Sequence, residues 1–130
     1  MRLVREEKGQ AIVEFALVVS LFLLMMLGMI TFGQLLNAQL SVTYLAREGA
    51  RLAALGGTDQ AVISAVQSLL PPPLDVARLN VQVAPAVRPR GTPITVSVTY
   101  RVDLNIPLVV TALGRDHINL LGTTTMVSEI

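Results

Sequence analysis

Residues 15–33 read FALVVSLFLLMMLGMITFG, an uncharged run of 19 residues in which Ser20 and Thr31 are the only hydroxyl side chains. A helix needs about 20 predominantly apolar residues to cross a hydrocarbon core of about 30 Å. Leu, Met, Ala and Val dominate the run, and proline is absent. The run therefore predicts a transmembrane helix, and this helix decides the fold of the N-terminal part of the chain.

The charges on either side of the run predict its orientation. Arg2, Arg5 and Lys8 precede it, and the next basic residue after it is Arg47. Basic residues close to a span favour the cytoplasmic side, whereas acidic residues count for little. We therefore expect a cytoplasmic N-terminus, with the bulk of the chain on the other side of the membrane.

Two simpler explanations of the run are a cleaved secretory signal and a plain membrane anchor. A secretory signal has an apolar core of about 7–15 residues and a small-x-small cleavage site. This run is longer, and the nearest candidate site, residues 36–38, places a leucine at a position that requires a small residue. Glu14 argues against a plain anchor, because a carboxylate costs about 2.5–3.5 kcal/mol at the bilayer centre on insertion scales and less near the interface. A carboxylate at the mouth of the run could also snorkel to the interface.

The composition excludes several classes of function. The chain has 130 residues, of which 52% are hydrophobic and only 15% are charged, against about 25% charged in a typical soluble domain. A net charge of +1 leaves no basic field for nucleic acid, and no cysteine is present. The single histidine, His117, has only Asp116 and Asn119 beside it. We therefore predict no catalytic residue, no metal site and no cofactor, and expect that the chain is not an enzyme.

The helical pattern continues beyond the membrane span. Apolar residues recur without proline as far as Leu55, and Gly56-Gly57 is a typical stop signal. A helix from Ala11 to Leu55 would be about 68 Å long at 1.5 Å per residue, more than twice what a single span needs. Its outer half must therefore pack against something else.

Small and charged residues mark this helix as a packing element. Small residues allow helix backbones to approach closely, and neighbouring subunits or the chain's own sheet are both open as the packing partner. The small residues that we single out are Gly28, Gly33, Ala46, Gly49, Ala50 and Ala53, with Ala54 and Gly57 completing the rows at four-residue spacing. Arg47, Glu48 and Arg51 form a charged cluster in which Glu48 and Arg51 can pair across one turn.

The remaining residues predict a small α+β domain. Thr58-Asp59 can cap a helix over residues 60–70, and the alternating residues 79–83 and 94–104 predict two antiparallel strands. The intervening hairpin loop is rich in Pro and Gly and carries Arg88 and Arg90. Residues 106–113 predict a short helix, with Pro107 at its first position. A last strand follows at residues 118–127, where a slip in the alternation predicts a bulge near Gly122. The result is a three-stranded sheet laid on the long helix.

One motif precedes the apolar run: Gly9-Gln10-Ala11-Ile12-Val13-Glu14-Phe15. A glycine, four residues, a glutamate and an aromatic residue, placed after a short charged leader, resemble the cleavage site of type IV prepilins of the Tad/Flp class. Over residues 9–54 the chain resembles the TadE-like minor pilins, or pseudopilins. Ser20 is a departure, because the family often has proline there.

The resemblance implies a site and a set of partners. A prepilin peptidase would cut between Gly9 and Gln10, making Glu14 the fifth and Phe15 the sixth mature residue. The carboxylate of Glu14 would then meet the N-terminal amine of a neighbouring subunit and set the axial register. The implied partners are the inner membrane, the peptidase and other pilin subunits, without nucleic acid.

The expected organisation is a cytoplasmic leader at 1–9, a transmembrane part at 10–36, an exposed part of the same helix at 37–57 and an extracytoplasmic domain at 58–130. The resemblance implies a pilin-like structural subunit, single-pass in the cytoplasmic membrane, that acts in pilus assembly or adhesion and reaches a cell-surface pilus after processing. The alternative is a single-span membrane protein whose outer domain binds a ligand or partner without forming filaments.

Overall fold

In the computed structural model, the backbone is described for residues 2–104 and 106–129, and side chains for residues 8–104, 106–107 and 110–129. The leader side chains on which the expected orientation rests, Arg2 and Arg5, lie outside the described residues. The chain divides into two compact units, Met1–Leu35 and Leu36–Ile130, and each is described here by itself.

The long helix α1 spans Arg2–Ala54. Its end agrees with the prediction, because Gly56 adopts φ 87° and the Gly57 N–H donates to the Leu52 carbonyl at 3.0 Å. Its start, predicted at Ala11, was wrong by nine residues. Residues 2–8 contain no proline and several good helix formers, so the single Gly9, which costs about 1 kcal/mol, does not interrupt the helix.

In the first unit, α1 exposes its apolar side chains. The most hydrophobic 18-residue window has a mean hydropathy of 2.5, and none of it is buried, so by length and composition α1 is a candidate membrane span. The hydroxyls of Ser20 and Thr31 donate to the carbonyls of Ala16 and Leu27, four residues earlier, at 2.7 and 2.9 Å. These bonds satisfy the two polar side chains without water, as a lipid environment requires.

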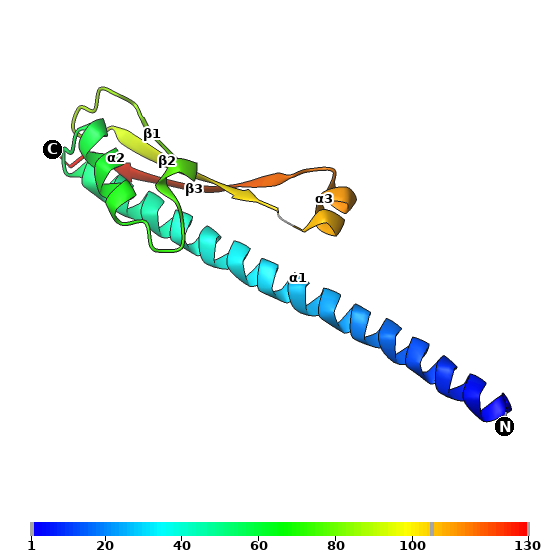
Figure 1. The fold of residues 1–130 in the computed structure, drawn as a ribbon. Helices are drawn as coiled ribbons and strands as arrows, with labels where there is room; N and C mark the ends of the chain where they lie inside the picture. Colours follow the sequence, from blue (N-terminus) through cyan, green and yellow to red (C-terminus); the bar gives the residue numbers. More distant parts are fainter. Residues whose placement is uncertain (1, 105, 130) are drawn as a thin grey trace. The chain divides into compact units, whose positions relative to one another are not determined.

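The second unit is α+β, as predicted (Figure 1). It contains strands β1 (Leu79–Ala84), β2 (Pro93–Asp103) and β3 (His117–Val127), which form one antiparallel sheet in the order β1-β2-β3. Each strand lies within one residue of its predicted range at either end. This topology is that of two successive hairpins.

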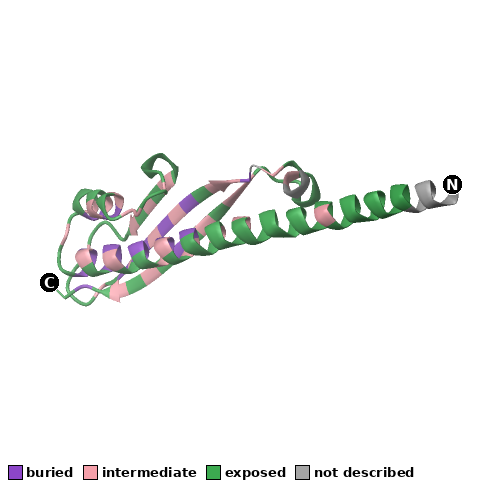
Figure 2. Ribbon diagram, turned by 60° about the horizontal axis from the view of Figure 1, so that its bottom comes forward, coloured by how far each residue is buried: buried purple, intermediate pink, exposed green. Residues whose placement is uncertain are grey.

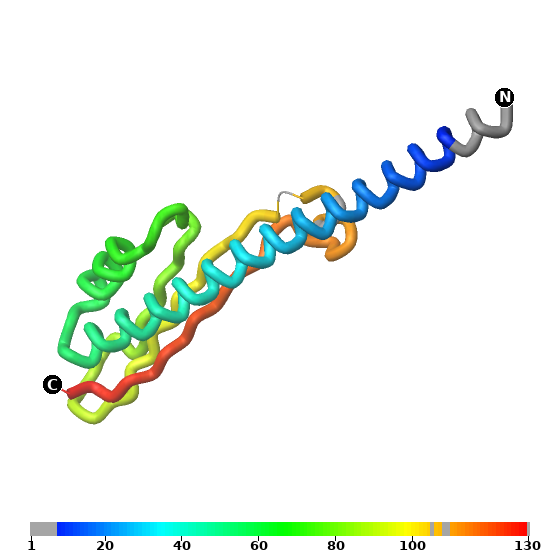
Figure 3. The backbone as a smooth tube through the Cα atoms, turned by 90° about the horizontal axis from the view of Figure 1, so that it is seen from below, coloured from blue at the N-terminus to red at the C-terminus, as the bar shows by residue number. Residues whose placement is uncertain are grey.

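The core of the second unit lies between the sheet and residues 36–54 of α1. Strand β2 alternates as predicted, with Ile94, Val96, Val98 and Tyr100 buried. Figure 2 shows buried residues gathered along β2 and along this part of α1, and Figure 3 shows α1 from the side on which it covers the sheet. The core residues contributed by the helices are Ala38, Val42, Leu45, Ala46, Ala50, Ala53, Val62 and Val66.

Three shorter helical segments complete the unit. Helix α2 (Asp59–Ser68) has Thr58 as its N-cap, which accepts from the Ala61 N–H, so it starts as predicted and ends two residues early. A 3₁₀ turn, η1 (Val76–Arg78), was not predicted. Helix α3 (Pro107–Leu113) has proline in its first turn and ends at Gly114, which adopts the left-handed conformation with φ 63°.

The predicted bulge near Gly122 is absent. Strands β2 and β3 pair one to one from Pro93↔Val127 to Asp103↔His117, with Gly122 opposite Val98. The alternation in the sequence slips because Gly122 and Thr124 face the helix while Leu121 is exposed. A Cβ on Gly122 would lie 2.7 Å from the Val42 carbonyl oxygen, so the glycine permits close approach of α1 to β3.

Candidate functional site

The predicted processing segment lies on α1. Gly9 and Gln10 are exposed, and a Cβ placed on Gly9 would meet no atom within 4 Å. The chain's own packing therefore gives no reason for a glycine at this position. Glycine in a helix interior costs about 1 kcal/mol relative to alanine, so its presence here needs a reason outside the folding of this chain.

Glu14 and Phe15 lie one turn further along α1, both exposed. Phe15 is 70% exposed and Val13 is 61% exposed, so the carboxylate stands within an apolar surface. Within the described part of the chain, no salt bridge includes Glu14. A carboxylate at the edge of an apolar span is a functional candidate because it needs a partner once water is removed.

The small residues of α1 divide into two groups. A Cβ on Gly28 or Gly33 would meet nothing within 4 Å. In contrast, a Cβ on Gly49 would lie 3.0 Å from Val66 Cγ2 and 3.1 Å from Val96 Cγ1. The chain's own core thus accounts for the close packing at Gly49, and it likewise buries Ala46, Ala50, Ala53 and Ala54.

The charged cluster lies on the opposite side of α1 from this core. Arg51 Nη1 lies 3.4 Å from Glu48 Oε1, and the two side chains are 68% and 30% exposed. Arg47 is exposed as well. An exposed pair of this kind contributes about 0.3–0.5 kcal/mol, so the cluster adds little to the stability of the fold.

An exposed stripe on the same side of α1 was not predicted from the sequence. Leu40 is 70% exposed and Tyr44 is 55% exposed. Both belong to a set of exposed residues at the three- and four-residue spacing of one helix face. The members of this stripe are Leu36, Leu40, Tyr44, Arg47, Arg51 and Leu55. The helix is apolar on almost every face here, so periodicity alone does not separate the buried face from the exposed one.

A second feature that the sequence did not predict is the anchoring of Arg88. Its guanidinium donates from Nη1 to the Gly57 carbonyl at 3.0 Å and from Nε to the Pro85 carbonyl at 2.9 Å. It also forms an ion pair with Asp59, and its side chain is only 10% exposed. Arg88 thereby ties the β1–β2 loop to the turn between α1 and α2.

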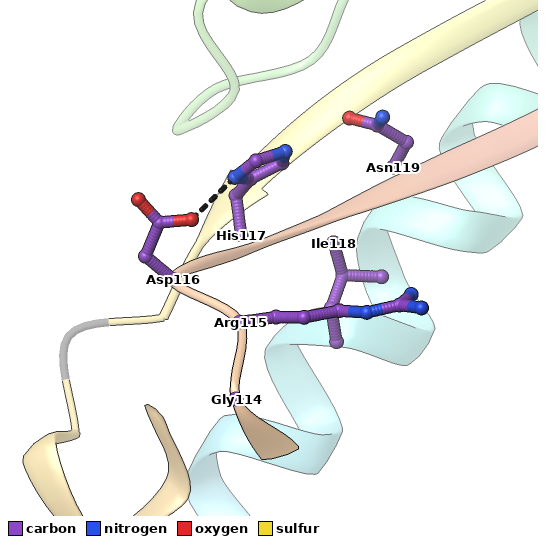
Figure 4. A pocket seen from close by; sticks show the side chains of 6 residues that line it. All are labelled: Gly114, Arg115, Asp116, His117, Ile118 and Asn119. Atoms are coloured by element: carbon purple, nitrogen blue, oxygen red, sulfur yellow. Dashed lines mark hydrogen bonds and ion pairs between the residues drawn. The ribbon is translucent and has the colours of Figure 1, made fainter. Parts of the chain in front are cut away.

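A hollow of about 460 Å³ is lined by residues 114–119 at the start of β3 (Figure 4). His117 Nδ1 and Asp116 Oδ1 lie 2.6 Å apart, and this hydrogen bond lowers the pKa of the Asp116 carboxyl below its ordinary value. The described residues contain no cluster of three His, Cys, Asp or Glu side chains that could hold a metal ion. The pair is exposed and has no nucleophile in the lining of the hollow, so this geometry points to no reaction.

Comparison with known proteins bears on the apolar helix and its outer extension. No curated protein and no solved structure matches the chain. A family model does match, over residues 9–51. The matched segment starts at the predicted cleavage glycine and ends within the charged cluster, at Arg51. Over this segment, about a third of its length, the chain is similar to TadE-like proteins, which is consistent with a TadE-like pilin.

Proposed function

We propose that this chain is a structural subunit of the minor-pilin, or pseudopilin, type, which is processed after Gly9 and acts in the assembly of a Tad-type pilus. The observation that carries the proposal is the exposed apolar surface of α1 with Glu14 at its start. No residue of the apolar window is buried within the chain. Lipid covers such a surface first, and helices of neighbouring subunits cover it after assembly.

The proposed organisation has four parts. Residues 1–9 are a cytoplasmic leader, 10–36 the membrane-spanning part of α1, 37–57 its exposed part and 58–130 an extracytoplasmic domain. The TadE-like match begins at Gly9, where the leader would end. The processed subunit would start at Gln10, with a free amine four residues before Glu14.

Glu14 is proposed to set the register between subunits. In an assembled bundle its carboxylate would pair with the N-terminal amine of a neighbour. Leaving one member of a buried pair without its partner costs about 3–5 kcal/mol. A Cβ at Gly28 or Gly33 would meet no atom of the described residues within 4 Å, so these glycines would let neighbouring helices approach closely along the same surface.

The first test is the mass of the mature protein. Intact mass spectrometry of the membrane form, purified from its own cells, is expected to show an N-terminus at Gln10. Gly9→Val is expected to retain the leader, because a β-branched side chain replaces the hydrogen at the predicted cut. An intact leader in the wild-type protein, or a start after Ala38, would contradict the pilin assignment and favour a single-span protein that forms no filament.

The second test separates processing from assembly. Glu14→Ala is expected to be cut normally and to be lost from the sheared filament fraction. Glu48→Ala is the matched control, because Glu48 lies on the same helix in a weak, exposed pair. If Glu14→Ala enters filaments at the wild-type level, the register role is wrong even though the processing site stands.

A further inference from the structure

The segment between β2 and β3 forms an uncharged tip on the second unit. Eleven consecutive residues, Leu104 to Gly114, contain no charged side chain. The ladder ends at Asp103↔His117, and the Leu104 N–H donates to the Asp116 carbonyl at 2.8 Å. Helix α3, which lies between these two bonds in the chain, therefore projects beyond the end of the sheet.

The described residues of the tip expose apolar side chains, and the hydroxyl among them is hydrogen-bonded. Leu113 is 55% exposed, and Pro107 and Ala112 are exposed as well. The hydroxyl of Thr111 donates to the Pro107 carbonyl at 2.8 Å, in the same manner as the two hydroxyls of the apolar segment of α1. At the C-terminal end of α3, the Gly114 N–H donates to the Val110 carbonyl.

Three contacts locate the tip within the second unit. Gln39 Nε2 donates to the Leu121 carbonyl at 3.1 Å, and the Glu129 N–H donates to the Ala54 carbonyl at 3.0 Å. Between them, Gly122 lies against Val42. Strand β3 and α1 therefore run in the same direction, and the start of β3 lies at the end of the unit where α1 enters it, opposite to the C-terminus (Figure 1).

At this end of the unit, β3 extends further beyond the Gln39–Leu121 contact than α1 does. From Leu121 back to His117, β3 extends about 13 Å at 3.3 Å per residue. From Gln39 back to Leu36, α1 covers only about 4.5 Å. The tip therefore projects past the point where α1 enters the unit. At that point the chain is covalently joined to the apolar run, which ends at Gly33.

We propose that the α3 tip docks on the lipid surface from which α1 emerges. The inference rests on the membrane-anchoring part of the proposed function. Lipid is the occupant because the tip lies at the end of the second unit where the chain joins the candidate span, and because the tip is uncharged and exposes apolar side chains. The neighbouring charges cancel, since Arg101 and Arg115 are matched by Asp103 and Asp116. Docking therefore does not depend on anionic lipid.

The chain contains no cysteine, so single labelling sites can be introduced into the full-length protein. Leu113→Cys reports on the tip and Leu24→Cys on the span. Val87→Cys is the matched control, an exposed apolar residue, 78% exposed, in the β1–β2 loop at the opposite end of the unit. Each variant is labelled with an environment-sensitive fluorophore and reconstituted at low density in phosphatidylcholine vesicles that contain a nitroxide-labelled lipid.

We expect quenching by the nitroxide lipid at positions 24 and 113 and little at 87, with no further increase at 113 when anionic lipid is added. Quenching at 24 but not at 113 would overturn the tip inference and leave the membrane anchor standing. No quenching at 24 would remove the anchor on which both proposals rest. A third outcome is a label at position 113 that is not quenched by lipid but reports a less polar environment as the protein density rises. This outcome would mean that the tip contacts another copy of the chain, and it would overturn the inference.

A charge placed on the tip provides a second measurement. Leu113→Asp, combined with a label at Ala112→Cys, is expected to reduce quenching to the level of the Val87 label, because a carboxylate resists transfer to the bilayer interface. Val87→Asp in the same labelled background is expected to leave quenching unchanged. Leu113 is more than half exposed, so the substitution leaves the core intact. Equal quenching with and without the aspartate would overturn the inference.

Discussion

At Gly122 the last strand closely approaches the backbone of the long helix. A Cβ there would lie 2.7 Å from the carbonyl oxygen and 2.9 Å from the carbonyl carbon of Val42. Both atoms belong to the backbone, so they cannot turn aside as the end of a side chain could. We predict that Gly122→Ala lowers the free energy of unfolding by about 1–3 kcal/mol, the usual cost of overpacking.

The measurement for Gly122→Ala is thermal or denaturant unfolding of the full chain in detergent, followed by circular dichroism. Gly33→Ala is the control, because a Cβ there meets nothing within 4 Å. Alanine at Gly33 is expected to be neutral or to stabilise the helix by up to about 1 kcal/mol. If Gly122→Ala leaves the free energy of unfolding unchanged or raises it, the helix and the strand are not closely packed at this position.

The Asp116–His117 pair makes a prediction about pH. The hydrogen bond from His117 is the main cause that lowers the pKa of Asp116, and the charge of Arg101 contributes least. A carboxyl whose pKa is lower in the folded state stabilises that state above its ordinary pKa. The contribution is lost as the pH falls through the folded-state value. Because Asp116 is fully exposed, the effect is read from its titration and not from global stability.

Carbon-detected NMR of the Asp116 carboxyl group gives this titration directly. We expect a midpoint below the ordinary value for aspartate, and a clear rise in His117→Ala. Arg101→Gln is the control and should raise the midpoint less. A larger shift in Arg101→Gln than in His117→Ala would reverse the assigned order of causes.

Residue patterns predicted the strands well but misread Gly122. In β2, large apolar residues alternate with polar ones, so the face turned to the core is unambiguous. In β3, a glycine and a threonine take inward positions while Leu121 faces outward. An inward glycine is understood only when the backbone that covers it is known, and that backbone lies 80 residues away in the chain, at Val42.

Among the elements, the β1–β2 loop depends most on one side chain. Arg88 holds the Gly57 and Pro85 carbonyls and pairs with Asp59. Arg88→Met keeps the length of the aliphatic stem and removes these donors. We predict a loss of about 1.5–3 kcal/mol in the free energy of unfolding, the range for hydrogen bonds made by a charged group.

Arg90→Met is the matched control for this element. Arg90 lies in the same loop, is exposed, and is expected to change stability by no more than about 0.5 kcal/mol. Both variants are compared with the wild type in a single denaturant series. Equal stability of the two variants would mean that the loop is held by its prolines and not by Arg88.

Element boundaries were predictable where local chemistry sets them. Gly56 ends α1, Thr58 caps α2 and Pro107 opens α3, all as expected. The 3₁₀ turn η1 was not predicted because it has only three residues and is held partly by a residue that is distant in the sequence. Its N-cap Asp75 accepts from the Ala77 N–H, while its own N–H donates to the Tyr100 hydroxyl on β2.

At the scale of the whole molecule, the proposed processing would change the net charge. The full chain has ten basic and nine acidic residues, and its sequence pI is about 8.3. Residues 1–9 contain three basic and two acidic side chains, so removing them leaves seven of each. We predict that the membrane form focuses below pH 8.3 and that Gly9→Val does not. A wild-type band that stays with the unprocessed variant would contradict cleavage at this site.

The candidate assembly site was predictable only in part. The apolar run, Glu14 and the glycine at position 9 are local signals, and the family match covers the same region. Which small residues serve the chain's own core and which face outward was not predictable, because the same spacing serves both. Gly49 lies against Val66 and Val96, whereas a Cβ added at Gly28 or Gly33 would meet none of the described atoms within 4 Å.

The contacts between α1 and β3 join the first and last elements of the second unit, through Val42 and Gly122 and through Ala54 and Glu129. Such pairings close long loops and form late. A ribosome adds about 5–20 residues per second, so the final strand reaches its place seconds after the helix has been synthesised. Until then the outer part of the chain lacks one edge of its sheet. The second unit therefore cannot complete its core until the last strand has been synthesised.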